Sequence, residues 1–110
     1  MRMFAITILA ALAFTATARA QDAKVSHGQQ VYADQKCGLC HSIGDKGNKK
    51  GPLDGVGAKL TAAEIREWMT DAKGMTAKTK ATRKPAMKAY SLPTEDVDSL
   101  VAYLETLKKK

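Results

Sequence analysis

The stretch KCGLCHS, residues 36–42, contains the only two cysteines of this 110-residue chain. Cys37 and Cys40 are three residues apart, and His41 follows the second cysteine directly. Such a pair is found in three kinds of site: a redox disulfide, part of a zinc site, and an attachment point for a larger group. The choice among these three decides the fold and the function.

The first twenty residues have the pattern of a secretory signal peptide. Arg2 gives a basic start, residues 3–18 carry no charge, and Ala18-Arg19-Ala20 ends the stretch in an A-x-A cleavage pattern. A membrane-spanning helix needs about 20 apolar residues, and this apolar run is shorter. We therefore predict cleavage after Ala20, a mature domain of residues 21–110 and a periplasmic location, with a retained membrane anchor as the alternative.

The mature segment has few large side chains with which to build a core. Loss of Arg2 and Arg19 lowers the formal charge from +7 to +5. The remaining aromatic residues are Tyr32, Trp68, Tyr90 and Tyr103. Domains of this size often need a disulfide, a metal or another cofactor for stability. One short disulfide would contribute little, because its stabilisation falls with loop length, so the composition favours a cofactor inside the core.

Three segments have the apolar periodicity of helices, and no alternating run predicts a strand. The first extends from about Ala23 to Lys36. The second begins at Thr61, which forms a capping box with Glu64, and we expect it to end near Gly74. The third follows an N-cap at Thr94 and carries its apolar stripe at Val97, Leu100, Val101, Leu104 and Leu107. Residues 42–60 contain five glycines and predict a loop, so we expect an all-α fold.

The context of the cysteine pair distinguishes the three kinds of site. A thiol–disulfide motif normally follows a strand and opens a helix, whereas this pair follows a helix. A structural zinc site needs four ligands, and Cys37, Cys40 and His41 supply three. His27 could be a fourth, but neighbouring Cys40 and His41 fit poorly around one tetrahedral ion, and we expect His27 on a helix surface. The third possibility is covalent haem attachment, for which C-x-x-C-H is the signature. Two cysteines on one face of a helical turn can reach one side of the ring, and His41 can then bind the iron.

A haem iron bound by one histidine needs a second axial ligand or keeps an open face. Methionine is a standard partner and raises the reduction potential. Met69 lies on the apolar face of the second helix, where packing suits it. Met87 lies in irregular chain just before the last helix, and we predict it to be the ligand. Met75 remains a minor alternative.

With these features the mature chain resembles the small monohaem class I c-type cytochromes that bacteria export. The resemblance rests on GQQVYADQKCGLCH (residues 28–41), GPLDGVG (51–57) and MKAYSLPTEDVDSLVAYL (87–104). It implies the class I cytochrome c fold, in which three main helices surround one covalently bound haem c and the amino- and carboxy-terminal helices cross. The crossing would place Gly28 against Tyr103.

The resemblance also implies roles for single residues. Cys37 and Cys40 would bind the haem, and the carbonyl of Pro52 would accept a hydrogen bond from His41. Tyr90 would pack on the haem. The family often has proline directly after the ligand methionine, but Lys88 follows Met87 here and Pro85 precedes it by two. Trp68 is expected either to pack or to bind a haem propionate.

With both axial positions filled, the iron has no free site for a substrate. We therefore expect an electron carrier and not an enzyme, with no small-molecule substrate, and we expect a monomer. Basic residues gather in two stretches, and we expect them to attract redox protein partners with acidic docking surfaces: Lys46, Lys49, Lys50, Lys73, Lys78, Lys80, Arg83, Lys84 and Lys88. Nucleic acid is a poor partner for an exported protein with few aromatic residues in its basic segments.

Two other functional classes remain open at the sequence level. The chain could be a haem subunit or a ligand-binding sensor domain in which Met87 dissociates, and carbon monoxide binding would identify this class. It could also be a thiol oxidoreductase, for which free thiols and the absence of visible absorption would be diagnostic.

Overall fold

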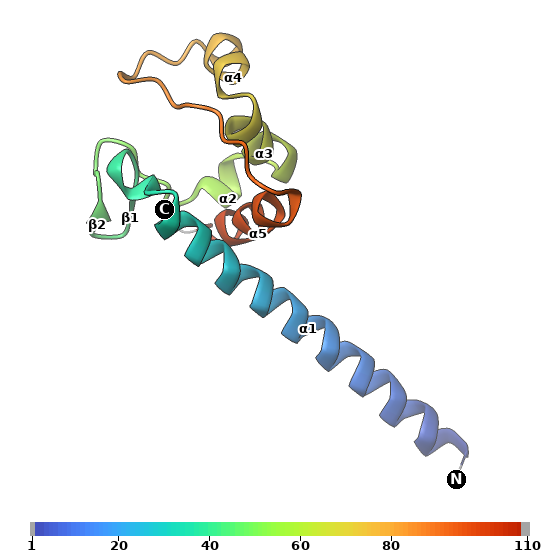
Figure 1. Cartoon of the computed structure of the whole chain (residues 1–110). Coiled ribbons are helices and arrows are strands. Elements are labelled where there is room, and N and C mark those ends of the chain that lie inside the picture. The colour runs from blue at the N-terminus through green and yellow to red at the C-terminus, as the bar shows by residue number, and fades with distance from the viewer. Residues whose placement is uncertain (1, 109–110) are drawn as a thin grey trace.

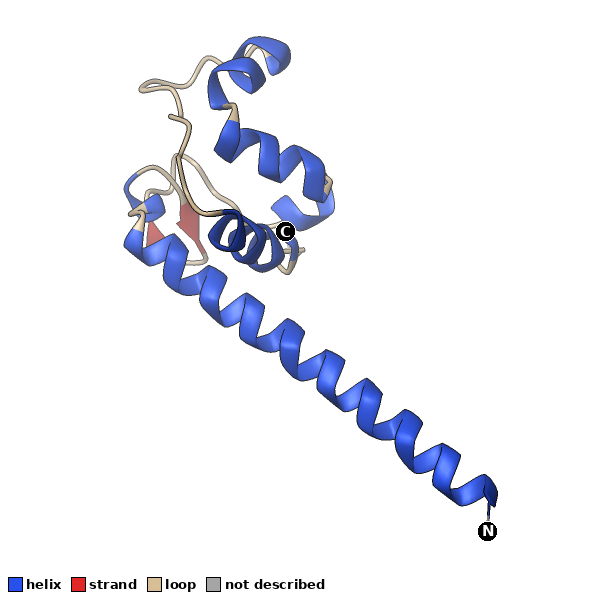
Figure 2. Ribbon diagram, turned by 45° about the vertical axis from the view of Figure 1, so that its right-hand side comes forward, coloured by secondary structure: helices blue, strands red, loops and turns tan. Residues whose placement is uncertain are grey.

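The computed structural model describes residues 2–108, and helices dominate it (Figures 1 and 2). Met1, Lys109 and Lys110, at the outer ends of the predicted leader and mature domain, lie outside the described residues. The all-α prediction is confirmed. The elements in chain order are α1 (Arg2–Asp34), a 3₁₀ helix (Cys37–Leu39), β1 (Ser42–Ile43), β2 (Lys46–Gly47), α2 (Val56–Lys59), α3 (Ala62–Thr70), α4 (Ala72–Thr79) and α5 (Thr94–Glu105).

The second half of α1 crosses α5, and this crossing is the main contact between distant parts of the chain (Figures 1 and 2). The two helices approach most closely at Gly28. A Cβ atom at this position would lie 2.7 Å from the Cβ of Tyr103 and closer still to the backbone carbonyl of Ser99. The predicted contact of Gly28 with Tyr103 is therefore confirmed. Tyr32, one turn further along α1, packs edge-on against Tyr103 with ring centroids 6.0 Å apart.

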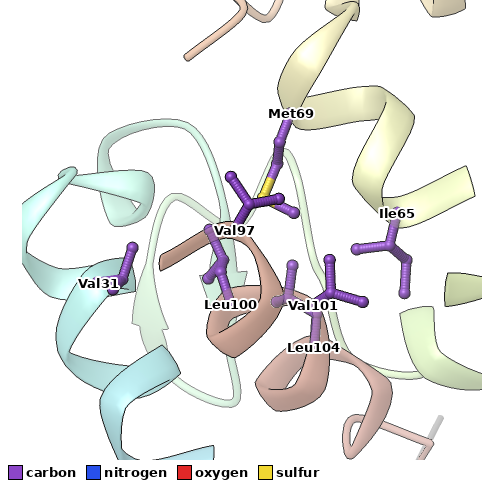
Figure 3. Packing of buried hydrophobic residues seen from close by; sticks show 7 residues of the cluster. All are labelled: Val31, Ile65, Met69, Val97, Leu100, Val101 and Leu104. Carbon is purple, nitrogen blue, oxygen red and sulfur yellow. The ribbon is translucent and has the colours of Figure 1, made fainter. Parts of the chain in front are cut away.

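The buried core is small and aliphatic, as the composition predicts. It joins α1, α3 and α5 through seven buried side chains (Figure 3): Val31, Ile65, Met69, Val97, Leu100, Val101 and Leu104. Four of them come from α5, whose apolar stripe agrees with the expected one. Ion pairs lie outside this core: His27 of α1 contacts Asp96 at 2.8 Å, and Arg66 of α3 contacts Asp98.

The chain between residues 61 and 80 forms two helices where the sequence predicted one. The capping box at Thr61 and Glu64 is present, with both hydrogen bonds made. The expected end at Gly74 is wrong, because α3 ends at Thr70 and Gly74 lies inside α4. The side chain of Asp71 accepts a 3.2 Å hydrogen bond from the N–H of Gly74 and so caps a new helix.

The glycine-rich loop contains more regular structure than predicted. Ser42 and Ile43 pair antiparallel with Lys46 and Gly47, and α2 follows within the same segment. The N–H of Gly57 donates to the carbonyl of Leu107 at 2.8 Å, which anchors α2 to the chain just after α5. The last helix also differs by one position, because Pro93 is its N-cap and Thr94 its first residue.

Helix α1 is longer than expected, because it begins at Arg2 instead of near Ala23. It ends at Asp34, and Lys36 then adopts a left-handed conformation with φ of 56°, which turns the chain out of the helix. Leader cleavage after Ala20 stays a prediction. Within residues 2–108 there is no helix long and apolar enough to cross a membrane.

We expect Gly28→Ala to destabilise the haem-containing protein, although alanine is the better helix former by about 1 kcal/mol. The added methyl group would collide with the Ser99 carbonyl and with Tyr103, and overpacking of this kind costs about 1–3 kcal/mol. Denaturant unfolding measures the loss. Gln29→Ala, on the exposed side of the same helix, is the matched control and should change stability little; a gain in stability for Gly28→Ala would contradict the predicted collision.

Candidate functional site

The turn after α1 brings both cysteines and His41 together. Cys37 opens the 3₁₀ helix, and its carbonyl accepts hydrogen bonds from the N–H groups of Cys40 at 3.1 Å and His41 at 2.9 Å. This turn places all three side chains on the wall of one cavity. Neither cysteine is in a disulfide. The spacing of the motif thus produces the expected grouping.

A hydrogen bond to a backbone carbonyl ten residues along the chain orients the ring of His41. The ring Nδ1–H donates to the carbonyl of Gly51 at 3.0 Å, and the same carbonyl accepts from the N–H of Ser42 at 3.1 Å. The prediction that Pro52 supplies this carbonyl is therefore corrected by one residue. Pro52 instead forms an isolated β-bridge with Ser42. It is exposed and does not line the cavity. With Nδ1 occupied in this way, Nε2 is the nitrogen left for a metal.

The cavity beside this turn has a volume of about 630 Å³. That is within the range of about 300–1,000 Å³ usual for ligand sites. Side chains from α1, α2, α3, α5 and the segment before α5 form its wall, and most of them are apolar. Figure 3 shows Leu100 and Leu104 of α5 together with Met69 and Ile65 of α3, all four of which contribute to this wall. The cavity therefore lies next to the protein core and shares side chains with it.

The structure separates the three candidate methionines. Met87 is half-buried, lines the cavity and packs against the core. Met69 also lines the cavity but is 97% buried among the core side chains, as expected for a packing residue. Met75 is buried in α4 and is not part of the cavity wall. Of the two candidates for the second ligand, only Met87 shares the cavity with His41.

Tyr90 and Trp68 are both half-buried in the cavity wall. The N–H of Tyr90 donates to the carbonyl of Met69 at 2.8 Å, which fastens the segment before α5 to α3. The ammonium group of Lys88 lies 5.3 Å from the centre of the Tyr90 ring, within the range of a cation–π contact. Tyr90 thus lines the cavity, and its packing on a haem stays a prediction.

The residues present fit a haem. The hydroxyl of Tyr32, which lines the cavity, is buried without a hydrogen-bond partner. Such orphaned groups are rare in proteins and call for an explanation, such as a missing ligand or water. The charged side chains of the wall are all basic, namely Lys36, Arg83 and Lys88. They complement the two carboxylates of a haem, and the two thiols and the imidazole supply its attachment chemistry.

The two other kinds of site receive no support from the structure. Burial raises the pKa of the Cys37 thiol, whereas a reactive redox cysteine needs a lowered pKa. Among residues 2–108, no group of three or more His, Cys, Asp or Glu side chains is arranged to hold a metal ion, which leaves the zinc hypothesis without a ligand set. Burial also lowers the pKa of His41, and the nearby charge of Arg83 adds to this effect. A neutral imidazole is the form that binds a metal.

Three site residues were not predicted in these roles from the sequence. They are the carbonyl of Gly51, the hydroxyl of Tyr32 and the guanidinium of Arg83. Each lies at the site because of how the backbone folds, which the Cys37–His41 motif itself does not indicate. The dipeptide Gly51-Pro52 was the available signal for the first. Tyr32 was recognisable only as an aromatic residue on the helix face that holds Gly28, and Arg83 only as one of many basic residues.

A family model described as Cytochrome c matches residues 25–108 of the chain. The matched part contains every residue of the site described above and all helices except the beginning of α1. Neither the comparison with curated proteins nor the comparison with solved structures found a match.

The buried hydroxyl of Tyr32 leads to a prediction for alkaline pH. Burial is the main reason why the pKa of Tyr32 is raised from 10.0 to about 12. Well below pH 10, for example at pH 8, the phenol is protonated in the folded and unfolded states alike. Between about pH 10 and 12 the unfolded state releases the proton more readily, so the stability that Tyr32 contributes is lost as pH rises.

Tyr32→Phe should therefore lose less unfolding free energy than the wild type between about pH 8 and pH 11. Because Tyr32 is only partly buried, solvent weakens the effect, and we expect a difference below about 1 kcal/mol. Denaturant unfolding of both haem-containing proteins at the two pH values measures it. The comparison cancels any pH-independent effect of removing the hydroxyl, and equal losses in the two proteins would refute the prediction.

Proposed function

Because the chain belongs to the cytochrome c family, we propose that it is a soluble periplasmic carrier that passes single electrons between redox proteins. Family membership implies one covalently attached haem c and a haem-based electron-transfer function. Our proposal adds the residues that would bind the iron, His41 and Met87, and the partners. The observation that carries it is that Cys37, Cys40, His41 and Met87 all line one cavity.

Each of these residues has a distinct task. Cys37 and Cys40 would hold the haem through thioether bonds, and their common turn sets the spacing of the two sulfur atoms. His41 would bind the iron through Nε2, since Gly51 holds Nδ1–H. Met87 would complete the coordination from a different part of the chain. When bound, the haem iron supplies a one-electron redox couple whose potential depends on the axial ligands and on burial.

The remaining wall residues act by packing and by excluding water. Ile65, Leu100 and Leu104 present apolar surface to the cavity. A low-dielectric surrounding disfavours the additional positive charge of the oxidised iron, so burial and the methionine both favour a high potential. No substrate position remains if both axial sites are filled, which is why we propose a carrier and not an enzyme.

The distribution of charge supports protein partners with acidic surfaces. Lys36, Arg83 and Lys88 line the cavity, and Lys46, Lys49 and Lys50 are exposed in the loop that carries the His41 hydrogen bond. Only the first three line the cavity; we propose that the haem is reached from outside on the side where these six basic residues lie. We propose that they attract acidic docking surfaces, that the carrier acts as a monomer, and that the signal peptide directs it to the periplasm.

One observation favours a second candidate function. Within the described part of the chain, no backbone–backbone hydrogen bond involves residues 82–89, the segment that carries Met87. A weakly held ligand could leave the iron and open a binding position, as in a haem subunit or a ligand-binding sensor domain. Carbon monoxide binding to the reduced wild-type protein separates the two functions, because a firmly held Met87 should resist it.

Replacing Met87 tests the proposed ligand. Met87→Leu should abolish the weak sulfur-to-iron absorption band of the oxidised protein and allow carbon monoxide to bind the reduced form. Its reduction potential should fall by on the order of 0.1 V, within the span of about 0.8 V that axial ligation covers. Met75→Leu, a change of similar size at a buried position outside the cavity, is the matched control. A persistent band in Met87→Leu would show that another group is the ligand.

The ionic-strength dependence of electron transfer tests the basic docking surface. Between about 0.01 M and 1 M salt, the rate constant for reaction with the anionic oxidant ferricyanide should fall several-fold, because salt screens the attraction. Lys88→Glu should weaken this dependence more than Lys59→Glu, since Lys88 lines the cavity and Lys59 does not. Equal effects of the two changes would mean that only net charge matters.

A further inference from the structure

The segment that carries Met87 has few attachments to the rest of the protein. Its last fixed points in the backbone are the hydrogen bonds of Ala81 to Thr76 and of Tyr90 to Met69. Figure 1 shows the chain between these points looping out on the side of the molecule where β1 and β2 lie. Side chains must therefore determine how residues 82–89 are held over the cavity.

One such side chain, Arg83, contacts the turn that orients His41. A Cβ atom at Gly51 would lie 3.0 Å from Cζ of Arg83 and closer still to a terminal nitrogen of the guanidinium. The guanidinium thus occupies the space that a side chain at position 51 would need. Neither of the two ion pairs found in residues 2–108 involves Arg83. Its contact with Gly51 is therefore not a by-product of pairing with an acid.

The position of Gly51 gives this contact its importance. The carbonyl of Gly51 holds the Nδ1–H of His41, and its N–H donates to Asn48 at 3.1 Å. Arg83 rests on the peptide that sets the direction of the imidazole. Its charge is also near enough to contribute to the lowered pKa of His41. Arg83 and Gly51 lie 32 positions apart in the sequence, so their contact joins two separate parts of the site.

We propose that Arg83 is a positioning residue. Its guanidinium packs against Gly51 and so holds the segment of residues 82–89, which carries Met87, close to the backbone that orients His41. The proposal rests on the proposed ligation by Met87. Without the guanidinium on Gly51, the nearest backbone anchors of the segment are Ala81 and Tyr90, six and three positions from Met87. Met87 would then leave the iron more often. The planar guanidinium suits this role better than an ammonium group, because it is more weakly hydrated and presents several donors in a rigid arrangement.

Imidazole, a small ligand of ferric haem, provides the measurement. It must displace Met87, so its apparent affinity follows the fraction of protein in which Met87 is dissociated. Arg83→Gln holoprotein should bind imidazole about fivefold or more tightly than the wild type. Lys84→Gln removes the same charge from the neighbouring residue, which does not line the cavity, and should stay within about twofold. Arg83→Lys should lie between the wild type and Arg83→Gln.

The reduction potential is a second readout that separates this role from a general effect on folding. Loss of a positive charge near His41 should lower the potential in Arg83→Gln more than in Lys84→Gln, because the charge disfavours the oxidised iron. Arg83→Lys keeps the charge and should largely retain the potential. Thermal unfolding of all four proteins identifies variants whose folding is impaired.

Equal imidazole affinities for Arg83→Gln and Lys84→Gln would overturn the proposal. If Arg83→Gln does not accumulate with haem, Arg83→Lys serves instead, and an affinity equal to that of Lys84→Gln would again overturn it. The sulfur-to-iron band of the wild type distinguishes the two levels of failure. If the band is missing, the proposed ligation by Met87 fails; if it is present and the affinities are equal, only the role of Arg83 fails.

Discussion

The close crossing of α1 and α5 at Gly28 determines where everything else in this protein lies. Because glycine has no side chain, the backbone of α5 can approach that of α1 until Ser99 and Tyr103 touch it. The crossing sets the positions of the Cys37–His41 turn, which leaves the end of α1, and of Leu100 and Leu104, which project from α5. Two walls of the cavity are thus fixed by one helix contact.

A cavity of about 630 Å³ is large for a domain whose core cluster, within the described residues, consists of seven buried apolar side chains. A small domain buries too little apolar surface to leave such a space without an occupant. The haem that the cytochrome c family carries would complete the core and supply the redox chemistry at the same time. Stability and function then depend on the same group, because the side chains that pack against the ring also exclude water from the iron.

The two sides of the site are held in different ways. His41 lies in a turn with a dense hydrogen-bond network, in which Gly51 alone accepts from two donors. Met87 lies in a segment whose residues 82–89, as far as the structure describes the chain, make no backbone–backbone hydrogen bond. Such a segment opens more easily than a hydrogen-bonded turn. If Met87 binds the iron as proposed, this side of the site is where small changes in sequence would alter ligation and reduction potential.

Much of the local structure could be read from the sequence, because it depends on residues three or four positions apart. The capping box at Thr61, the apolar stripe of α5 and the grouping of Cys37, Cys40 and His41 are of this kind. The contact of Gly28 with Tyr103 could also be predicted, although only through the resemblance to the cytochrome family. The expected end of a helix at Gly74 failed because the side chain of Asp71 starts a new helix there, a local competition that helix periodicity does not reveal.

The sequence by itself determined the class of cofactor, the all-α fold and the helix that precedes the attachment motif, since each follows from the chemistry and spacing of neighbouring residues. Only the tertiary structure decided which carbonyl orients His41, that Met87 and not Met75 shares its cavity, and that Arg83 rests on Gly51. These features depend on how irregular chain runs between fixed helices. The path of such chain is set by contacts between residues far apart in sequence, where periodicity and propensity carry no information.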